Sequence, residues 1–162
     1  GLRFFTVYGP WGRPDMALFL FTKSVLEGRP INVFNNGDMI RDFTYIDDLV
    51  ESMYRLLGKP ALEDKEFDFQ NPSAATSWKR YRIFNIGNAN PINLMDYINV
   101  IEKCLNKKAI LNKMPMQAGD VKETFADTKL LSDWINYKPQ TSIEEGVEKF
   151  VDWYINYYKD SI

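Results

Sequence analysis

Polar residues with ligand-binding chemistry occur where a predicted strand runs into a predicted helix, between Thr6 and Ala17. The preceding residues are apolar, aromatic or β-branched, and Gly9-Pro10 ends the strand. A helix that starts after such a strand presents free backbone N–H groups and the positive end of its dipole, which favour anions. Arg13 can add a bidentate, charge-assisted contact to the same anion. The alternative is a turn in which Arg13 is simply solvated, and the motif taken alone favours that alternative.

A second group combines an aromatic side chain with a cation on two neighbouring predicted strands. Val33-Phe34 ends one short strand, and Arg41 lies on the next. The ring can pack against a flat base while the guanidinium binds a phosphate. The alternative is that Phe34 belongs to the core. Arg41 would then pair with Asp42 or Asp38, and for this group alone that is the better interpretation.

The third group is a glycine-containing loop, Pro115 to Val121, which includes an acidic residue near its end. The carboxylate of Asp120 can accept both hydroxyls of a cis-diol, which is how proteins commonly hold a ribose. The alternative is a turn with Gly119 at a positive φ and Asp120 capping the residues that follow. The loop alone gives both interpretations equal weight.

The composition excludes several classes of protein. The 162 residues include no histidine, which excludes a Ser-His-Asp triad, a Cys-His pair and a histidine metal ligand. The single cysteine, Cys104, excludes an internal disulfide and is typical of a reducing, cytoplasmic compartment. A net charge of −2 gives no basic surface for nucleic acid, and no apolar run approaches the roughly 18 to 20 residues of a membrane span. We therefore expect no metal site, no nucleic-acid partner and no membrane partner.

The elements that must position these groups can be predicted from periodicity and turn residues. Apolar, β-branched runs predict strands at 2–8, 31–34, 40–45, 81–86 and 109–114, with a turn at 35–38 joining the second and third. Residues 59–80 have no period and are predicted to form a surface loop.

Helix starts are predicted from capping residues. They are placed at Pro14-Asp15, at Asp47 as an N-cap, at an Asx cap on Asn93, after Asp127, and at a capping box that begins at Ser142. The length and the 45% hydrophobic content suit one domain with its own core. The predicted fold is mixed α/β, α+β-like, with about five helices and several short strands, too irregular for a barrel or a bundle.

In this order and at these separations, the three groups resemble the C-terminal, substrate-binding half of extended short-chain dehydrogenases/reductases that act on nucleotide sugars. The similarity extends from Arg3 to about Tyr158 and is greatest to the UDP-glucuronate 4-epimerases. The segments that carry it are Arg3 to Ala17, Arg41 to Asp48, Tyr81 to Asn88, Pro115 to Val121 and Thr141 to Gly146. Within the first, the string from Gly12 to Ala17 indicates the glucuronate epimerases.

The resemblance implies a role for each matching residue at the substrate. Thr6 would contact the sugar near C5 and C6, and Arg13 would anchor the acidic substrate. The backbone amides of Ala17 and Leu18 would bind the pyrophosphate.

The resemblance also implies a nucleotide site. Val33 and Phe34 would hold the uracil, and Arg41 would bind a phosphate. Gln117 and Asp120 would meet the pyrophosphate side and the ribose. Many relatives carry arginine where Gln117 stands. Because glutamine is the weaker anion ligand, more of the anion binding would depend on Arg13 and Arg41 here. Phe4 and Phe5 would lie near the nicotinamide of NAD.

The residues that such enzymes use for catalysis are not found in this sequence. None of the nine tyrosines has a lysine four positions later, and no Gly-x-x-Gly-x-x-Gly occurs. We therefore expect the Rossmann NAD-binding domain and the catalytic acid/base to lie upstream of Gly1, so that residues 1–162 are an inactive substrate-binding domain. A start at Gly1, directly before a strand, is also typical of a piece of a longer protein.

The parent would be a homodimeric epimerase that interconverts UDP-glucuronate and UDP-galacturonate, while the fragment would be a monomer. Three alternatives stay open. The parent can be a UDP-hexose 4-epimerase, a UDP-glucuronate decarboxylase or a dTDP-glucose 4,6-dehydratase. The chain can be a nucleotide-sugar-binding module without an enzyme half, or it can fold and bind nothing measurable.

Overall fold

A computed structural model describes residues 1–159, in which short strands alternate irregularly with helices. The strands are β1 (Leu2–Phe4), β2 (Thr6–Tyr8), β3 (Pro30–Val33), β4 (Ile40–Tyr45), β5 (Phe84–Ile86), β6 (Pro91–Asn93) and β7 (Ile110–Lys113). The α-helices are α1 (Ala17–Leu26), α2 (Ile46–Leu57), α3 (Leu94–Leu105), α4 (Lys129–Ile135) and α5 (Ile143–Tyr157), and η1 (Phe34–Gly37) is a 3-10 helix. The predicted mixed α/β class, with five α-helices in the described residues, is confirmed.

The strands form three small sheets. In the central sheet β4 lies between β2 and β6. It runs parallel to β2, with Phe43 opposite Thr6, and antiparallel to β6, with Ile40 opposite Asn93. The other two sheets are parallel pairs, β1 with β5 and β3 with β7. Parallel pairing of β2 with β4 requires a crossover connection, which the segment containing α1 and β3 supplies.

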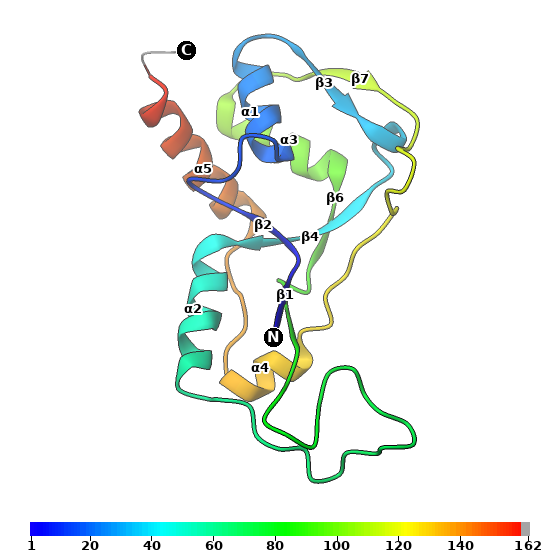
Figure 1. Cartoon of the computed structure of the whole chain (residues 1–162). Coiled ribbons are helices and arrows are strands. Elements are labelled where there is room, and N and C mark those ends of the chain that lie inside the picture. The colour runs from blue at the N-terminus through cyan, green and yellow to red at the C-terminus, as the bar shows by residue number, and fades with distance from the viewer. Residues whose placement is uncertain (160–162) are drawn as a thin grey trace.

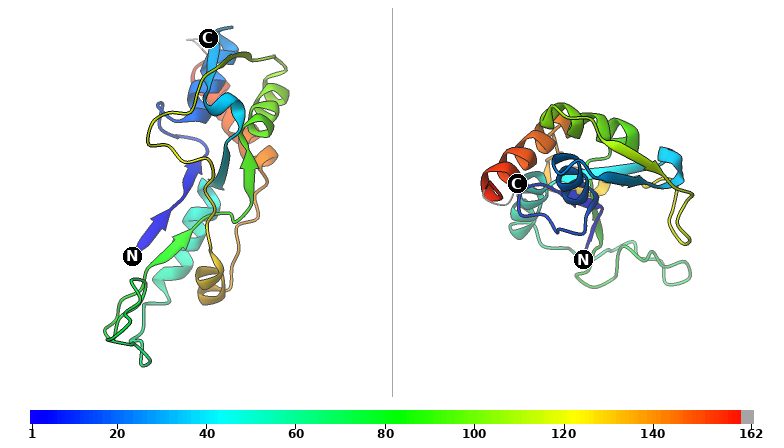
Figure 2. Two further views of the ribbon diagram at one scale, coloured as in Figure 1. Left: turned by 90° about the vertical axis from the view of Figure 1, so that its right-hand side faces the viewer. Right: turned by 90° about the horizontal axis from the view of Figure 1, so that it is seen from above.

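Two clusters of buried side chains hold the elements together. The larger lies in the upper part of Figure 1, where α1, α3 and α5 meet the central sheet, and includes Tyr97 and Phe150, each 1% exposed. The smaller lies between α2, β5 and α4 and includes Leu49, Ile86 and Leu131. The side view shows a molecule elongated along the line that joins the two clusters (Figure 2).

The strand predicted over residues 2–8 is divided between two sheets. Residues 2–4 pair with β5, and residues 6–8 pair with β4. The amide of Phe5 still donates to the carbonyl of Ile86 at 3.0 Å, so the change of partner follows directly after it. Since β5 belongs to the smaller cluster and β4 contributes to the larger, this segment connects the two.

The two strands predicted at either side of residues 35–38 are present, with η1 between them, but they do not pair with each other as a hairpin. β3 pairs with β7, and β4 pairs with β2 and β6. Asn35 and Asn36 adopt positive φ angles of 48° and 54° inside η1. Asparagine tolerates this left-handed backbone better than most residues. These two consecutive asparagines therefore direct the chain away from β3, so that β4 does not run alongside β3.

Two predicted helix starts are confirmed by their side-chain caps. The Oδ1 atom of Asn93 accepts a hydrogen bond from the amide of Met95 at 2.8 Å at the start of α3. The Oγ atom of Ser142 accepts one from the amide of Glu145 at 3.1 Å at the start of α5. Each bond satisfies a backbone donor that the helix itself leaves free.

Two other helix starts are displaced from their predicted positions. α1 begins at Ala17 and not at Pro14-Asp15, because the Asp15 carboxylate bonds to Arg13 instead of capping the helix. α2 begins at Ile46, so Asp47 lies in its first turn and is not the N-cap. The charge of Asp47 still complements the positive end of the α2 dipole.

The long stretch at residues 59–80 is the loop at the bottom of Figure 1, as predicted. It contains no helix, and its one isolated bridge joins Thr76 to Arg82 just beyond it. The loop lies at the far end of the molecule from α1 and β3 (Figure 1), so it takes no part in positioning the site described next.

Candidate functional site

A small cavity lies at the junction between β2 and α1. Thr6, Arg13, Ala17 and Leu18, all predicted to bind substrate, line it together. The rings of Phe43, Tyr97 and Phe150 complete its wall. Its volume is about 40 Å³, which holds a water molecule but no sugar. The cavity by itself is therefore too small to enclose a nucleotide sugar.

The start of α1 supplies hydrogen-bond donors next to this cavity. No side chain caps the N-terminus of α1. The amide of Leu20 bonds to the carbonyl of Met16 at 3.0 Å, so the ladder of the helix begins there. The amides of Ala17 and Leu18 precede it and have no acceptor within the helix. They are the two donors that the sequence predicted for an anion.

Arg13 forms an exposed ion pair with Asp15. The Arg13 Nε atom donates to Asp15 Oδ1 at 3.0 Å and Nη2 donates to Oδ2 at 2.5 Å, while both side chains remain more than 60% exposed. The hydrogen bond and the charge of each partner raise the pKa of Arg13 and lower that of Asp15. Water screens such a pair strongly, so an anion bound at α1 can replace Asp15 as the partner of Arg13.

A second hollow, about 360 Å³, brings Phe34 close to the start of α1. Ala17 and Asp15 line this hollow together with Phe34 and Asn32. Val33 is fully buried, and its carbonyl accepts the amide of Met114 at 2.9 Å. Of these two residues, only Phe34 has a side chain that reaches the hollow, where its ring is half-buried. A contact of either residue with uracil stays a prediction.

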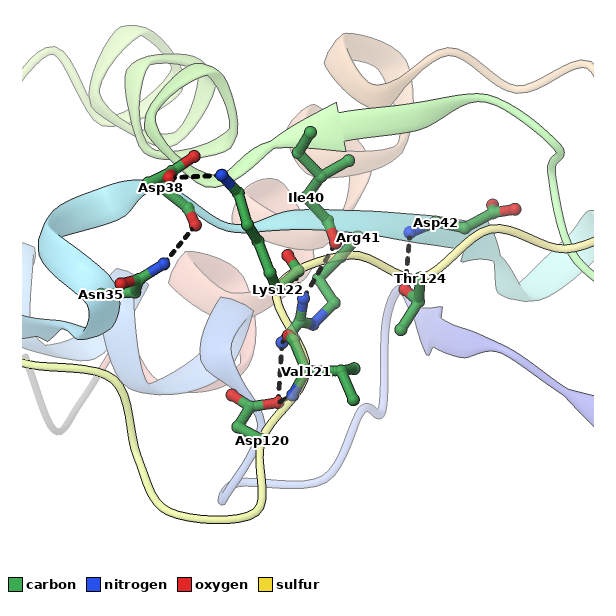
Figure 3. A network of polar contacts seen from close by, with 9 residues as sticks. All are labelled: Asn35, Asp38, Ile40, Arg41, Asp42, Asp120, Val121, Lys122 and Thr124. Carbon is green, nitrogen blue, oxygen red and sulfur yellow. Dashed lines mark hydrogen bonds and ion pairs between the residues drawn. The ribbon is translucent and has the colours of Figure 1, made fainter.

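Arg41 fastens the segment after the Gln117–Asp120 turn to β4 (Figure 3). Its Nη2 atom donates to Asp120 Oδ1 at 2.8 Å and to the carbonyl of Val121 at 2.7 Å. Its Nη1 atom donates to the carbonyls of Ile40 at 2.9 Å and Lys122 at 3.1 Å. Two residues predicted to bind the nucleotide, Arg41 and Asp120, are therefore in direct contact.

The alternative pairing of Arg41 with Asp42 or Asp38 is wrong. Asp38 pairs with the ammonium group of Lys122 at 2.6 Å instead. Asp42 is fully buried and accepts three backbone amides: those of Asn88 at 3.0 Å, Ala89 at 3.1 Å and Ala126 at 3.0 Å. Sequence reasoning missed this role, although an acidic residue directly before Phe43 in a strand was a visible signal for it.

The turn at the end of the third group has the predicted backbone conformation. The amide of Asp120 bonds to the carbonyl of Gln117 at 3.2 Å, and Gly119 has a φ of 83°. Glycine is favoured at this third position of the turn because a Cβ would be strained there. The Gln117 side chain is exposed, and its contact with a pyrophosphate stays a prediction.

Three of the described residues that line the cavity have ionisable side chains: Tyr8, Arg13 and Tyr97. Burial raises the pKa of Tyr8 well above its ordinary value, and the negative charge of Asp48 raises it further. The hydroxyl group donates to the carbonyl of Ser142 at 3.3 Å. The raised pKa keeps this hydroxyl group protonated at neutral pH, as a hydrogen-bond donor to α5's N-cap residue.

Phe4 and Phe5 lie apart from this cavity, before β2 begins. Phe4 is 51% exposed on β1, while Phe5 is half-buried and bonded to β5 through its amide.

Residues 1–159 contain no group of three potential metal ligands, and none of their helices has the length and apolar character needed to cross a bilayer.

The predicted residues do not line one closed pocket: the Arg41–Asp120 pair lines neither the cavity nor the hollow of Phe34. Ala17 lines both the cavity and the hollow of Phe34, which joins these two. Phe43 lines the cavity and lies two residues after Arg41 on β4, so the two side chains emerge on the same face of the strand. The cavity, the hollow and the Arg41–Asp120 pair together flank α1 and β4.

Comparisons with known proteins identify the family of the chain. The sequence profile of the NAD dependent epimerase/dehydratase family matches residues 1–87. Over 159 residues the chain is 53% identical to Protein CapI of Staphylococcus aureus, with 98% of this chain and 48% of the relative covered. Over 158 residues it is 48% identical to the probable UDP-glucuronate 4-epimerase of Rhizobium meliloti (strain 1021), with 97% of this chain and 46% of the relative covered.

Among solved structures, the chain is similar to the UDP-glucuronic acid 4-epimerase from Bacillus cereus in complex with UDP-glucuronic acid and NAD. The TM-score is 0.79 at 34% identity, with 97% of this chain and 45% of that chain covered. The chain spans about half the length of the relatives it matches. Because the profile covers more than half of the 162 residues, the chain belongs to the NAD dependent epimerase/dehydratase family.

Proposed function

We propose that residues 1–162 are the substrate-binding part of an NAD-dependent epimerase that interconverts UDP-glucuronate and UDP-galacturonate. The observation that carries the proposal is the convergence of Thr6, Arg13, Ala17 and Leu18 on one cavity at the start of α1. The likeness to a UDP-glucuronic acid 4-epimerase crystallised with UDP-glucuronic acid and NAD supports it.

In this proposal the diphosphate lies at the N-terminus of α1. The free amides of Ala17 and Leu18 donate to its oxygens, and Arg13 exchanges Asp15 for the negatively charged substrate. The uracil packs on Phe34, beside Ala17 in the neighbouring hollow. Asp120, held by Arg41, accepts the ribose hydroxyls. The cavity at Thr6 then forms the floor beneath the sugar.

NAD would be bound mainly by a region upstream of these residues, together with the catalytic acid and base. The contribution of the present chain is limited to the exposed ring of Phe4, an apolar surface of the kind on which a nicotinamide can pack. When bound, NAD supplies reversible oxidation at C4 of the sugar. The chain described here binds and orients the substrate for it.

Several further properties belong to the same proposal. The enzyme acts in the cytoplasm, and its products serve the synthesis of polysaccharides that contain uronic acids. The full-length protein is a homodimer, while the present chain alone is a monomer. Light scattering on both species tests these two states.

Full-length protein supplied with NAD is expected to convert UDP-glucuronate, and a preference for UDP-glucose would assign it to the hexose epimerases instead.

Weak binding is expected for the isolated chain. Because the NAD-binding region would provide the opposite wall of the site, residues 1–162 offer little buried area and little preorganisation to the ligand. UDP-glucuronate should bind with a dissociation constant on the order of a millimolar. Titration calorimetry measures this value, and sub-micromolar affinity would contradict a one-sided site.

Replacing Thr6 by valine in the full-length protein is expected to increase loss of CO₂ from the substrate by about tenfold, the equivalent of one lost hydrogen bond. A uronate oxidised at C4 is a β-keto acid, which loses CO₂ when its C5–carboxylate bond aligns with the carbonyl π system. Thr6 lines the cavity floor and can hold the carboxylate out of that alignment.

The readout is CO₂ and keto-pentose released per turnover. Thr22→Val is the matched control, since Thr22 is a fully buried threonine of α1 whose hydroxyl has no partner in residues 1–159. Equal CO₂ release from the Thr6 variant and the wild type would remove Thr6 from this role.

A further inference from the structure

Trp11 occupies a backbone position that suits glycine. It is the third residue of the turn Gly9–Gly12, which is closed by a hydrogen bond from the Gly12 amide to the Gly9 carbonyl at 3.1 Å. Its φ is 63°. Turns of this kind favour glycine or asparagine at the third position, because other side chains are disfavoured at positive φ. A bulky residue held in such a conformation must be fixed by its surroundings.

The surroundings that fix Trp11 belong to α5. Its ring lies 5.3 Å from the ring of Trp153 and 5.0 Å from that of Tyr157, the latter in an edge-to-face arrangement. Figure 1 shows α5 beside the connection between β2 and α1 that carries the turn. Trp11 nevertheless stays 70% exposed, so filling the core does not explain its presence. The contact attaches a surface turn to a helix.

The same turn forms part of the wall of the substrate cavity. Gly9, Gly12 and Arg13 line the cavity on one side, and Phe150 of α5 lines it on another. A Cβ at Gly12 would lie 3.0 Å from the Gly9 carbonyl oxygen and 4.0 Å from the Phe150 ring, so the turn sits directly against α5. The distance between this turn and α5 therefore sets the shape of the cavity.

We propose that Trp11 is a positioning residue, which fastens the Gly9–Gly12 turn to α5 and thereby places Arg13 at the substrate. The inference rests on the proposed function and adds a residue to it. Trp11 acts through Arg13, since Arg13 follows the turn directly and contacts the cavity, whereas the Trp11 ring faces Trp153 and Tyr157.

The decisive variant is Trp11→Gly in the full-length protein. Glycine relieves the backbone strain but also removes the ring contacts with Trp153 and Tyr157, so a merely structural role predicts a change in thermal stability with unchanged kinetics. A positioning role predicts that KM for UDP-glucuronate rises about tenfold while kcat changes less than twofold, because ground-state binding is lost. Trp11→Phe should restore most of the affinity. Phe69→Gly is the control, as Phe69 is 71% exposed on the distant loop.

A double-variant cycle tests whether Trp11 acts through Arg13. In an Arg13→Ala background, Trp11→Gly should raise KM by less than twofold, because the group it positions is already gone. Tyr157→Ala removes part of the anchor from the other side and should reproduce the KM effect without altering the turn itself. This variant decides the question if Trp11→Gly does not fold.

The outcomes separate the two proposals. A wild-type protein that converts no UDP-glucuronate overturns the proposed function. An active wild type whose KM is unaffected by Trp11→Gly and Tyr157→Ala overturns the positioning role alone. The positioning role is also overturned if the increases in KM caused by Trp11→Gly and Arg13→Ala multiply in the double variant, because Trp11 would then act independently of Arg13.

Discussion

Replacing Asp42 by alanine is expected to lower the free energy of unfolding by about 4 kcal/mol, from the cost of leaving three backbone donors, one buried and two part-buried, without an acceptor. The carboxylate is fully buried and accepts the amides of Asn88, Ala89 and Ala126, which come from two segments far apart in the sequence. Urea unfolding of the isolated chain measures the change.

Asp38→Ala is the matched control for this experiment. Asp38 lies on the same stretch of chain, but its carboxylate is about 60% exposed and pairs only with the exposed ammonium group of Lys122. Surface pairs of this kind contribute less than about 1 kcal/mol. A loss of similar size in both variants would show that Asp42 has no special structural role.

Arg41→Ala in the full-length protein is expected to reduce kcat/KM for UDP-glucuronate by about a hundredfold, the effect of losing one or two charge-assisted hydrogen bonds. The variant removes a positive charge from the site. It also removes the three hydrogen bonds by which the guanidinium holds Asp120 and the segment after it to β4. Both effects weaken binding of the nucleotide, so the expected loss appears mainly in KM.

Arg41→Lys and Lys122→Ala refine the measurement. Lysine retains the charge but lacks the planar guanidinium group that donates to several acceptors together. We therefore expect kcat/KM of the Arg41→Lys variant to be at least tenfold below that of the wild type. Lys122 belongs to the same segment, but its side chain is 59% exposed and its ammonium group pairs with Asp38. Its removal should change kcat/KM less than threefold. Full activity of the lysine variant would reduce the role of Arg41 to its charge.

Local signals in the sequence predicted the features that depend on neighbours in the chain. Ser142 and Asn93 cap the helices that follow them because the acceptor and the donor are two or three residues apart. The same holds for Gly119, whose positive φ depends only on its own turn. Thr6, Arg13, Ala17 and Leu18 meet at one cavity because a single strand-to-helix junction carries them.

Features that depend on distant partners could not be predicted in this way. β3 pairs with β7, whose residues lie eighty positions further along, and no local pattern specifies such a register. The amide partners of Asp42 lie 46, 47 and 84 positions away. For the same reason the Arg41–Asp120 contact, which spans 79 positions, was not expected as a direct ion pair. The family resemblance named both residues but not their contact.

The exchange of partners at Phe5 has a mechanical consequence. One continuous stretch of seven residues, Leu2 to Tyr8, is hydrogen-bonded at its beginning to a strand of the small cluster and at its end to a strand of the large one. Thr6, at which the proposed floor of the sugar site begins, directly follows the residue where the stretch changes partner. A relative movement of the two clusters would therefore act on the backbone next to Thr6.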